Sequence, residues 1–75
     1  MPKLTKVHWK ALERVILKKG FKLARERGSH RSYTKPGVNR AVVIPKYDAV
    51  PEFVIKNCLR TAGISREEHF EILED

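Results

Sequence analysis

The chain has 75 residues, of which 41% are hydrophobic and 33% are charged, a composition typical of a globular protein and not of a disordered one, and its length favours one folded domain over residues 1–75. Its single cysteine, Cys58, excludes an intramolecular disulfide, and its longest apolar run, residues 41–44, is too short to cross a membrane. We therefore expect a cytoplasmic protein that folds without disulfide bonds.

The net charge of +7 is unevenly distributed along the chain. Residues 1–60 contain fifteen basic and four acidic side chains, whereas residues 61–75 contain one basic and five acidic side chains. A basic body with an acidic end favours a polyanionic partner such as nucleic acid. Composition alone leaves a second explanation open, namely that net charge keeps a small protein soluble.

The first expected element is a helix over residues 6–19. Thr5 is a suitable N-cap, apolar residues then recur at helical spacing, and Gly20 supplies a left-handed C-cap. Basic side chains recur every four residues and predict a solvated helix face: Lys6, Lys10, Arg14 and Lys18.

Three strands are expected next, over residues 21–25, 29–35 and 40–44. Residues 26–28 form the first turn, in which Gly28 takes a backbone angle that other residues resist. A Pro-Gly pair breaks the chain after the second strand, and Pro45 ends the third. Short turns between the strands predict an antiparallel meander.

Strand periodicity assigns side chains to the two faces of this sheet. In the second strand, His30, Ser32 and Thr34 share one face. The other face carries Arg31, Tyr33 and Lys35. The residues expected to face the core from the sheet are Phe21, Leu23, Val42 and Ile44.

A second helix is expected to begin at Pro51 and to end at Gly63. Its apolar stripe consists of Val54, Ile55, Cys58, Leu59 and Ala62. Ser65 and Glu68 form a capping box that opens a short last helix carrying Phe70 and Leu73.

These elements give an α+β fold with the order α-β-β-β-α and a short extra C-terminal helix. Two helices are expected to cover one face of the three-stranded antiparallel sheet and to leave the other face open for binding. The order matches the double-stranded RNA-binding fold, which grips RNA by shape and backbone.

The candidate site lies in residues 25–33, where a lone histidine, His30, stands among three arginines: Arg25, Arg27 and Arg31. Histidine exchanges a proton near neutral pH, and arginine is well suited to hold a phosphate. Gly28 allows a phosphate to approach the backbone, and Ser29 offers a hydrogen bond. The pattern predicts metal-independent RNA cleavage that uses the 2′-hydroxyl of RNA as nucleophile. A strand histidine that only bonds across the sheet is the alternative.

The remaining reactive residues are assigned to structural roles. His8 and His69 are expected at the surface, and Cys58 and Trp9 in the core. The scattered histidines and single cysteine have no metal-ligand spacing, so no zinc site or cofactor is expected. Tyr33 can either stack on a base or pack between strands.

Four short motifs together resemble the HicA toxins, which are small RNA-cleaving components of toxin–antitoxin pairs. The motifs are Lys19-Gly20-Phe21, Gly28-Ser29-His30, Val42-Val43-Ile44-Pro45 and the run from Ile55 to Ile64 that ends in Leu59-Arg60-Thr61-Ala62-Gly63-Ile64. The resemblance covers nearly the whole chain and implies an mRNA interferase that a HicB-type antitoxin neutralises by covering its site.

The resemblance also assigns the catalytic role to His30. Many members of the family carry a second histidine after the proline that ends the third strand, whereas this chain has Lys46 and Tyr47 there. One of these two must take its place in RNA handling, and we include Lys46 among the RNA-binding residues. Two other functions stay open: a non-catalytic RNA-binding module, and a protein whose main task is to bind another protein.

Overall fold

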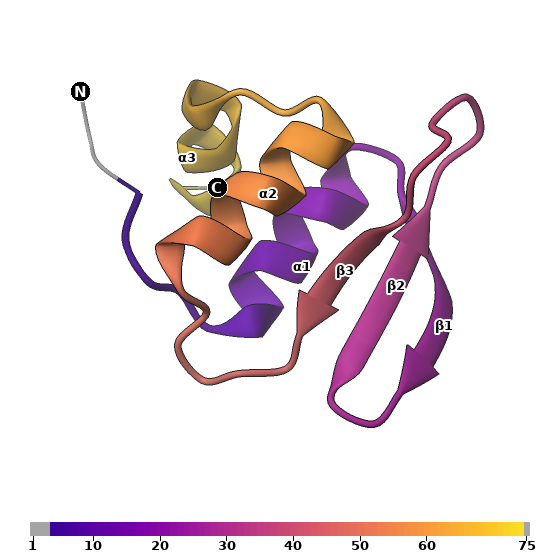
Figure 1. The fold of residues 1–75 in the computed structure, drawn as a ribbon. Coiled ribbons are helices and arrows are strands. Elements are labelled where there is room, and N and C mark those ends of the chain that lie inside the picture. Colours follow the sequence, from indigo (N-terminus) through magenta and orange to yellow (C-terminus); the bar gives the residue numbers. More distant parts are fainter. Residues whose placement is uncertain (1–3, 75) are drawn as a thin grey trace.

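A helix, three antiparallel strands and two further helices follow one another in the computed structural model, which describes residues 4–74 (Figure 1). The predicted α+β fold is confirmed. Its elements are α1 (Trp9–Lys18), β1 (Lys22–Arg27), β2 (His30–Thr34), β3 (Val42–Pro45), α2 (Glu52–Ala62) and α3 (Arg66–Glu74). Within the described residues, no helix has the length and apolar character needed to span a membrane.

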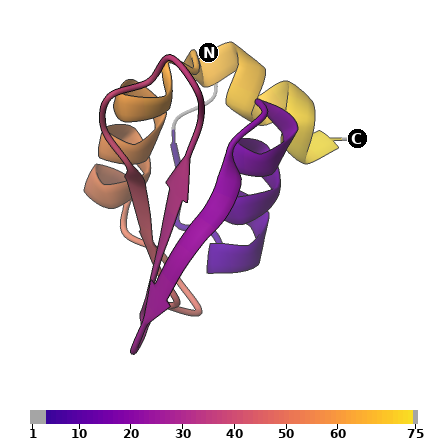
Figure 2. The ribbon, with the colours of Figure 1, turned by 90° about the vertical axis from the view of Figure 1, so that its right-hand side faces the viewer.

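The three strands pair antiparallel in the order β1-β2-β3. Helices α1 and α2 lie behind the sheet in Figure 2, and α3 packs on α1. The opposite face of the sheet carries no helix within the described residues. This two-layer arrangement agrees with the sequence-based expectation that one sheet face stays open.

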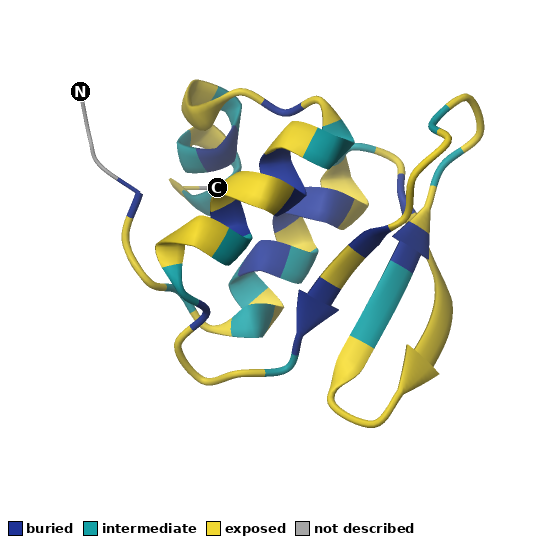
Figure 3. Ribbon diagram, in the orientation of Figure 1, coloured by how far each residue is buried: buried dark blue, intermediate teal, exposed yellow. Residues whose placement is uncertain are grey.

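The core forms where the helices meet β3 and the end of β2 (Figure 3). Of the four residues expected to face it from the sheet, Phe21, Val42 and Ile44 are buried. The expectation for Leu23 is wrong, because its side chain is 45% exposed. Leu23 lies on β1, an edge strand that extends beyond the helices and whose six residues are all exposed.

Helix α1 begins three residues later than the sequence suggests, with His8 instead of Thr5 as the N-cap. The tertiary structure holds the preceding residues extended. Val7 pairs with Val50 in an isolated β-bridge, and the Trp9 amide donates to the Tyr47 carbonyl at 3.1 Å. His8 caps the helix by accepting a hydrogen bond from the Lys10 amide on its Nδ1 atom.

The strands are shifted by one or two residues from their predicted bounds. Strand β1 continues through Arg27, so the first turn consists of Gly28 and Ser29, and Gly28 has the expected positive φ of 58°. Two-residue turns of this kind suit the twist of a hairpin. Pro45 belongs to the end of β3 instead of following it.

The predicted start of α2 is wrong by one residue, whereas its predicted C-cap and the capping box of α3 are confirmed. Pro51 is the N-cap of α2, one residue before the helix, and Gly63 ends it with φ 71°. The capping box is formed in both directions: the Ser65 amide donates to Glu68, and the Glu68 amide donates to the Ser65 hydroxyl. Lys19, directly after α1, reaches Glu68 at 2.6 Å and ties the start of α3 to the end of α1.

The surface location expected for His69 is wrong, because this residue is only 1% exposed. Helix α3 packs on α1, and its docking, which the sequence does not specify, turns His69 inward beside the Phe70 ring. The His69 Nδ1 atom has no hydrogen-bond partner within the described residues. Burial lowers the pKa of His69 below its ordinary value, since an imidazolium cation would lose its hydration there.

One carboxylate, that of Glu13 on α1, fixes β2 to the helix layer. The Tyr33 hydroxyl donates a hydrogen bond to Glu13 Oε2, and Arg31 Nη1 donates to the same oxygen at 2.7 Å. Tyr33 is fully buried, which resolves its role as packing between sheet and helix. Burial, followed by the bond to Glu13, raises the pKa of Tyr33 above its ordinary value.

Replacement of Glu13 by alanine is expected to lower the free energy of unfolding by about 3 kcal/mol, because two part-buried donors lose their acceptor. Tyr33→Phe removes one hydrogen bond to a charged group and should cost about 1.5–3 kcal/mol. Urea denaturation measures both changes. Glu71→Ala, at an exposed position of α3, is the control, and equal stabilities of Glu13→Ala and the control would contradict this role.

The buried His69 predicts a loss of stability in acid. Its pKa is lowered from 6.5 in the folded protein, so below about pH 6.5 the unfolded chain binds more protons than the native state. The free energy of unfolding should therefore fall as the pH falls through this range, and His69→Leu should reduce that fall. Urea melts of both proteins at pH 7.5 and 5.5 test this. If the free energy of unfolding changed equally with pH in the wild type and in His69→Leu, His69 would not titrate on unfolding.

Candidate functional site

The candidate site is located at the tip of the β1–β2 hairpin, where His30 begins β2 immediately after the Gly28-Ser29 turn. His30 is exposed, and its Nδ1 atom lies 3.5 Å from the Ser29 hydroxyl. A Cβ atom added to Gly28 would meet nothing within 4 Å. The turn thus needs glycine for its backbone angle, and the space around it is open to a ligand.

A β-bulge in β1 determines which arginines share a face with His30. The register places Leu23 opposite Tyr33, Arg25 opposite Ser32 and Arg27 opposite His30, so Ala24 is an extra residue. Directly opposed residues of antiparallel strands project from the same face. Strict alternation from Leu23 would have put both arginines on the helix side, whereas the bulge moves them to the open face.

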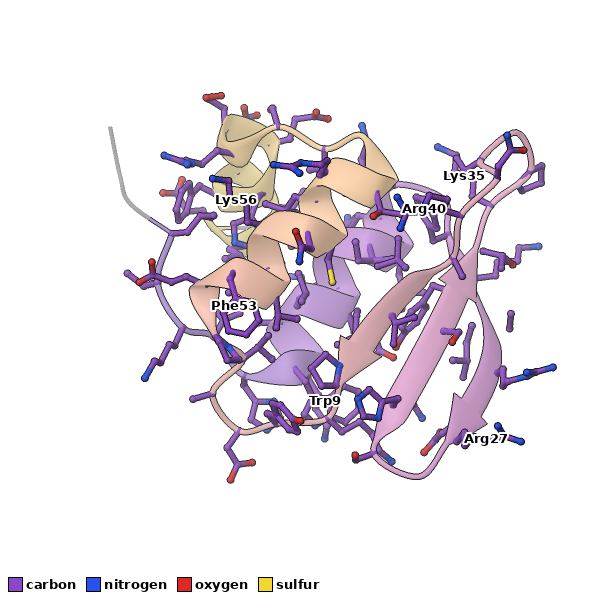
Figure 4. All side chains as sticks on the ribbon, viewed as in Figure 1. Trp9, Arg27, Lys35, Arg40, Phe53 and Lys56 are labelled. Carbon is purple, nitrogen blue, oxygen red and sulfur yellow. The ribbon has the colours of Figure 1, made fainter. Side chains whose placement is uncertain are left out.

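The open face of the sheet therefore carries basic side chains beside the histidine. Lys22 lies opposite Thr34 and joins Arg25 and Arg27 on this face, and all three are exposed. The one acidic residue of the strands, Glu26, lies opposite Arg31 on the helix side. Figure 4 shows Arg27 projecting from the tip of the hairpin, away from the helices. Sequence reasoning missed Lys22, because only the register places it in line with the two arginines.

Two predicted phosphate-binding residues, Arg31 and Lys46, lie instead in an ion-pair network on the helix side. Arg31 Nε donates to Glu26 at 2.9 Å, its Nη1 donates to Glu13 at 2.7 Å, and Lys46 Nζ also pairs with Glu26. Lys46 and then Arg31 hold the pKa of Glu26 below its ordinary value, and Glu26 and then Glu13 raise the pKa of Arg31.

The backbone of Lys46, in contrast, takes part in the site's scaffold. Its amide donates to the Ser29 carbonyl at 2.6 Å and extends the β2–β3 pairing past Pro45, which lies opposite His30.

The structure thus brings His30, Ser29, Arg25 and Arg27 together on one face. It places the side chains of Arg31 and Lys46 where they neutralise carboxylates. Glu13 and Glu26 are the only acids between residues 6 and 46, a signal that could have identified them as counter-ions.

The other residues singled out in the sequence lie apart from this face. Cys58 is buried, as expected, and its thiol donates to the Val43 carbonyl at 3.3 Å. Burial raises the pKa of this thiol to about 11, which makes Cys58 a poor nucleophile. Trp9 is half-buried against the core, and His8 is exposed as predicted.

Comparison with protein-family models agrees with the HicA resemblance of the sequence motifs. The family model described as "HicA toxin of bacterial toxin-antitoxin" matches residues 9–64, from the start of α1 to the end of α2, and so includes the sheet and His30. No curated protein matches the chain. The match covers well over half of the 75 residues. The chain therefore belongs to the HicA family of toxins from toxin–antitoxin systems.

Proposed function

We propose that this toxin is a metal-independent endoribonuclease that cleaves mRNA in the cytoplasm, with His30 as its proton-transfer group. The observation that carries the proposal is the composition of the open sheet face. His30 lies there directly opposite Arg27, with Arg25 opposite Ser32 and Lys22 opposite Thr34 further along the same face, and the carboxylates of Glu13 and Glu26 are bonded on the other side. Such a face attracts a phosphodiester and offers it a group that exchanges protons.

The chemistry uses a nucleophile that RNA itself carries. The His30 imidazole removes the proton of a 2′-hydroxyl, and the 2′-oxygen attacks the adjacent phosphorus. The pentavalent intermediate then expels the 5′-oxygen, which takes up a proton, and leaves a 2′,3′-cyclic phosphate and a free 5′-hydroxyl. One P–O bond forms, one P–O bond breaks, and protons move between oxygen and nitrogen. General acid–base catalysis of this kind contributes roughly 10²–10⁴-fold in rate.

The arginines supply the charge that this reaction needs. Opposed side chains on one face start about 5 Å apart at their Cβ atoms, so the Arg27 guanidinium can reach a phosphate bound at the His30 ring. A fixed cation at that point stabilises the negative charge that develops on the phosphorane oxygens. Arg25, opposite Ser32, lies one position further along the face and suits the neighbouring phosphate.

The proposed partner is a HicB-type antitoxin protein, since membership of this family implies an antitoxin. We propose that it neutralises the toxin by covering the open face. Exposed cations and an uncovered sheet provide a surface complementary to acidic side chains.

His30→Ala is expected to lower the rate of RNA cleavage by roughly 10²–10⁴-fold, because the 2′-hydroxyl loses its base. Cleavage of a synthetic RNA in EDTA, followed on a sequencing gel, measures this. A 2′-deoxy nucleotide at the cut position should block cleavage by the wild type at that bond. Cleavage by the variant at the wild-type rate would rule out His30, and an intact RNA bound by both proteins would favour a non-catalytic RNA-binding module.

Arg27→Ala should weaken RNA binding and flatten its salt dependence by about 0.7 units of log K per log unit of salt, the value for one lost contact with single-stranded RNA. Binding by the His30→Ala protein at several salt concentrations measures the slope. Lys56→Ala is the matched control, since Lys56 is an exposed cation on α2, far from Arg27 in Figure 4. Equal slopes for the two variants would show that RNA binds without Arg27.

A further inference from the structure

The segment that follows β3 lies next to the candidate site and is held on both sides. The Lys46 amide bonds to Ser29 of the hairpin turn at 2.6 Å. On the other side, the Tyr47 carbonyl accepts from the Trp9 amide at 3.1 Å, and the Val50 amide donates to Val7 at 2.7 Å. These bonds fix the backbone of Tyr47 without fixing its side chain.

The Tyr47 ring is an exposed aromatic surface at this end of the molecule. The residue is 46% exposed, and within residues 4–74 its side chain has no hydrogen bond, ring partner or cation. The neighbouring Trp9 differs, because its ring is stacked against His8 at 5.9 Å and has the Arg31 guanidinium 5.1 Å from its centroid. At this end of the molecule, the Trp9 ring is therefore engaged in contacts within the protein, whereas the Tyr47 ring is available to contact a ligand.

Tyr47 is also close enough to His30 to contact the same RNA strand. Pro45 is the Cα partner of His30 in the β2–β3 ladder, and Tyr47 follows two residues later. Paired Cα atoms lie about 5 Å apart and consecutive ones about 3.8 Å apart, so the Cα atoms of Tyr47 and His30 are within about 13 Å. A nucleotide with its phosphate at His30 and Arg27 therefore has the Tyr47 ring at the distance of its own or a neighbouring base.

We propose that Tyr47 is a stacking site for an unpaired nucleobase beside the scissile phosphate, an inference that rests on the RNA cleavage proposed above. Every base offers a π-face, and aromatic side chains bind that face without reading sequence. The cations of the open face hold only the RNA backbone, which single and double strands share. Tyr47 adds selection for single-stranded RNA, because a base inside a duplex is already stacked on its neighbours.

The test uses the His30→Ala protein, so that RNA stays intact, and an unstructured oligouridylate of about ten nucleotides. Fluorescence anisotropy measures the dissociation constant. Adding Tyr47→Ala should weaken binding about ten-fold, whereas Tyr47→Phe should keep the affinity. Tyr47→Leu, which retains apolar bulk without a π-face, should resemble Tyr47→Ala. Phe53→Ala is the matched control, since Phe53 is 69% exposed on α2, away from the hairpin (Figure 4).

A second measurement separates stacking from a structural role of Tyr47. One base of the oligonucleotide is removed at each position in turn. When the removed base is the one that stacks on Tyr47, the protein with Tyr47 and the protein with Tyr47→Ala should bind the abasic RNA with equal affinity. At the other positions, Tyr47→Ala should still weaken binding. Thermal melts check that all variants remain folded.

Three results would overturn the proposal. The first is that Tyr47→Ala has the same affinity as its parent protein. The second is an equal loss of affinity for oligouridylate and for a blunt RNA duplex, and the third is a loss that persists at every abasic position. Each would reject stacking while the RNA cleavage by His30 stands. If the His30→Ala protein with Tyr47 intact binds no RNA, the proposed function itself fails, and the stacking site fails with it.

Discussion

One extra residue in the edge strand β1, Ala24, determines on which face of the sheet the charged side chains of that strand lie. The bulge reverses the alternation of β1, so Arg25 and Arg27 project to the open face and Glu26 to the helix side. Without it, the arginines would face the helix layer and a carboxylate would lie beside His30. A negative charge there would repel a phosphodiester, so the register of one hairpin decides whether this surface suits RNA.

On the helix side of the sheet, two carboxylates hold neighbouring elements together through ion pairs and hydrogen bonds. Glu13 accepts from Arg31 and Tyr33, and Glu26 pairs with Arg31 and Lys46. These bonds connect α1, β1, β2 and the segment after β3 at one end of the molecule. In a chain of 75 residues with no disulfide, such links hold the strands that carry the site in a fixed register. They also neutralise Arg31 and Lys46, two cations that lie on the helix side of the sheet.

The site that results is small and solvent-exposed, which limits the chemistry available to it. Among the described residues, His30 has Ser29 as its one polar side-chain contact, and the electrostatic support comes from side chains across one strand pair. A hydrated site stabilises charge less than a buried one, because water screens the arginines. We therefore expect positioning of the RNA strand, by cations on one side and Tyr47 on the other, to contribute more than the strength of any single interaction.

Local signals in the sequence predicted the features that depend on a few neighbouring residues. Glycine at positions 28 and 63 indicated the left-handed backbone, the Ser65–Glu68 pair indicated the start of α3, and periodicity indicated three strands between helices. His30 and its arginines could be identified as a candidate group from their spacing alone, and the HicA resemblance agreed with the family match.

The sequence by itself thus determined the order of elements, their approximate bounds and the residues available for chemistry. Only the tertiary structure decided which of those residues lie together on one face. Whether Arg25 or Arg31 faces His30, whether Leu23 is covered and whether His69 is buried depend on strand register and on the docking of α3 against α1. The physical reason is that a side-chain face is set by long-range pairing, and a shift of one residue inverts it without changing any local propensity.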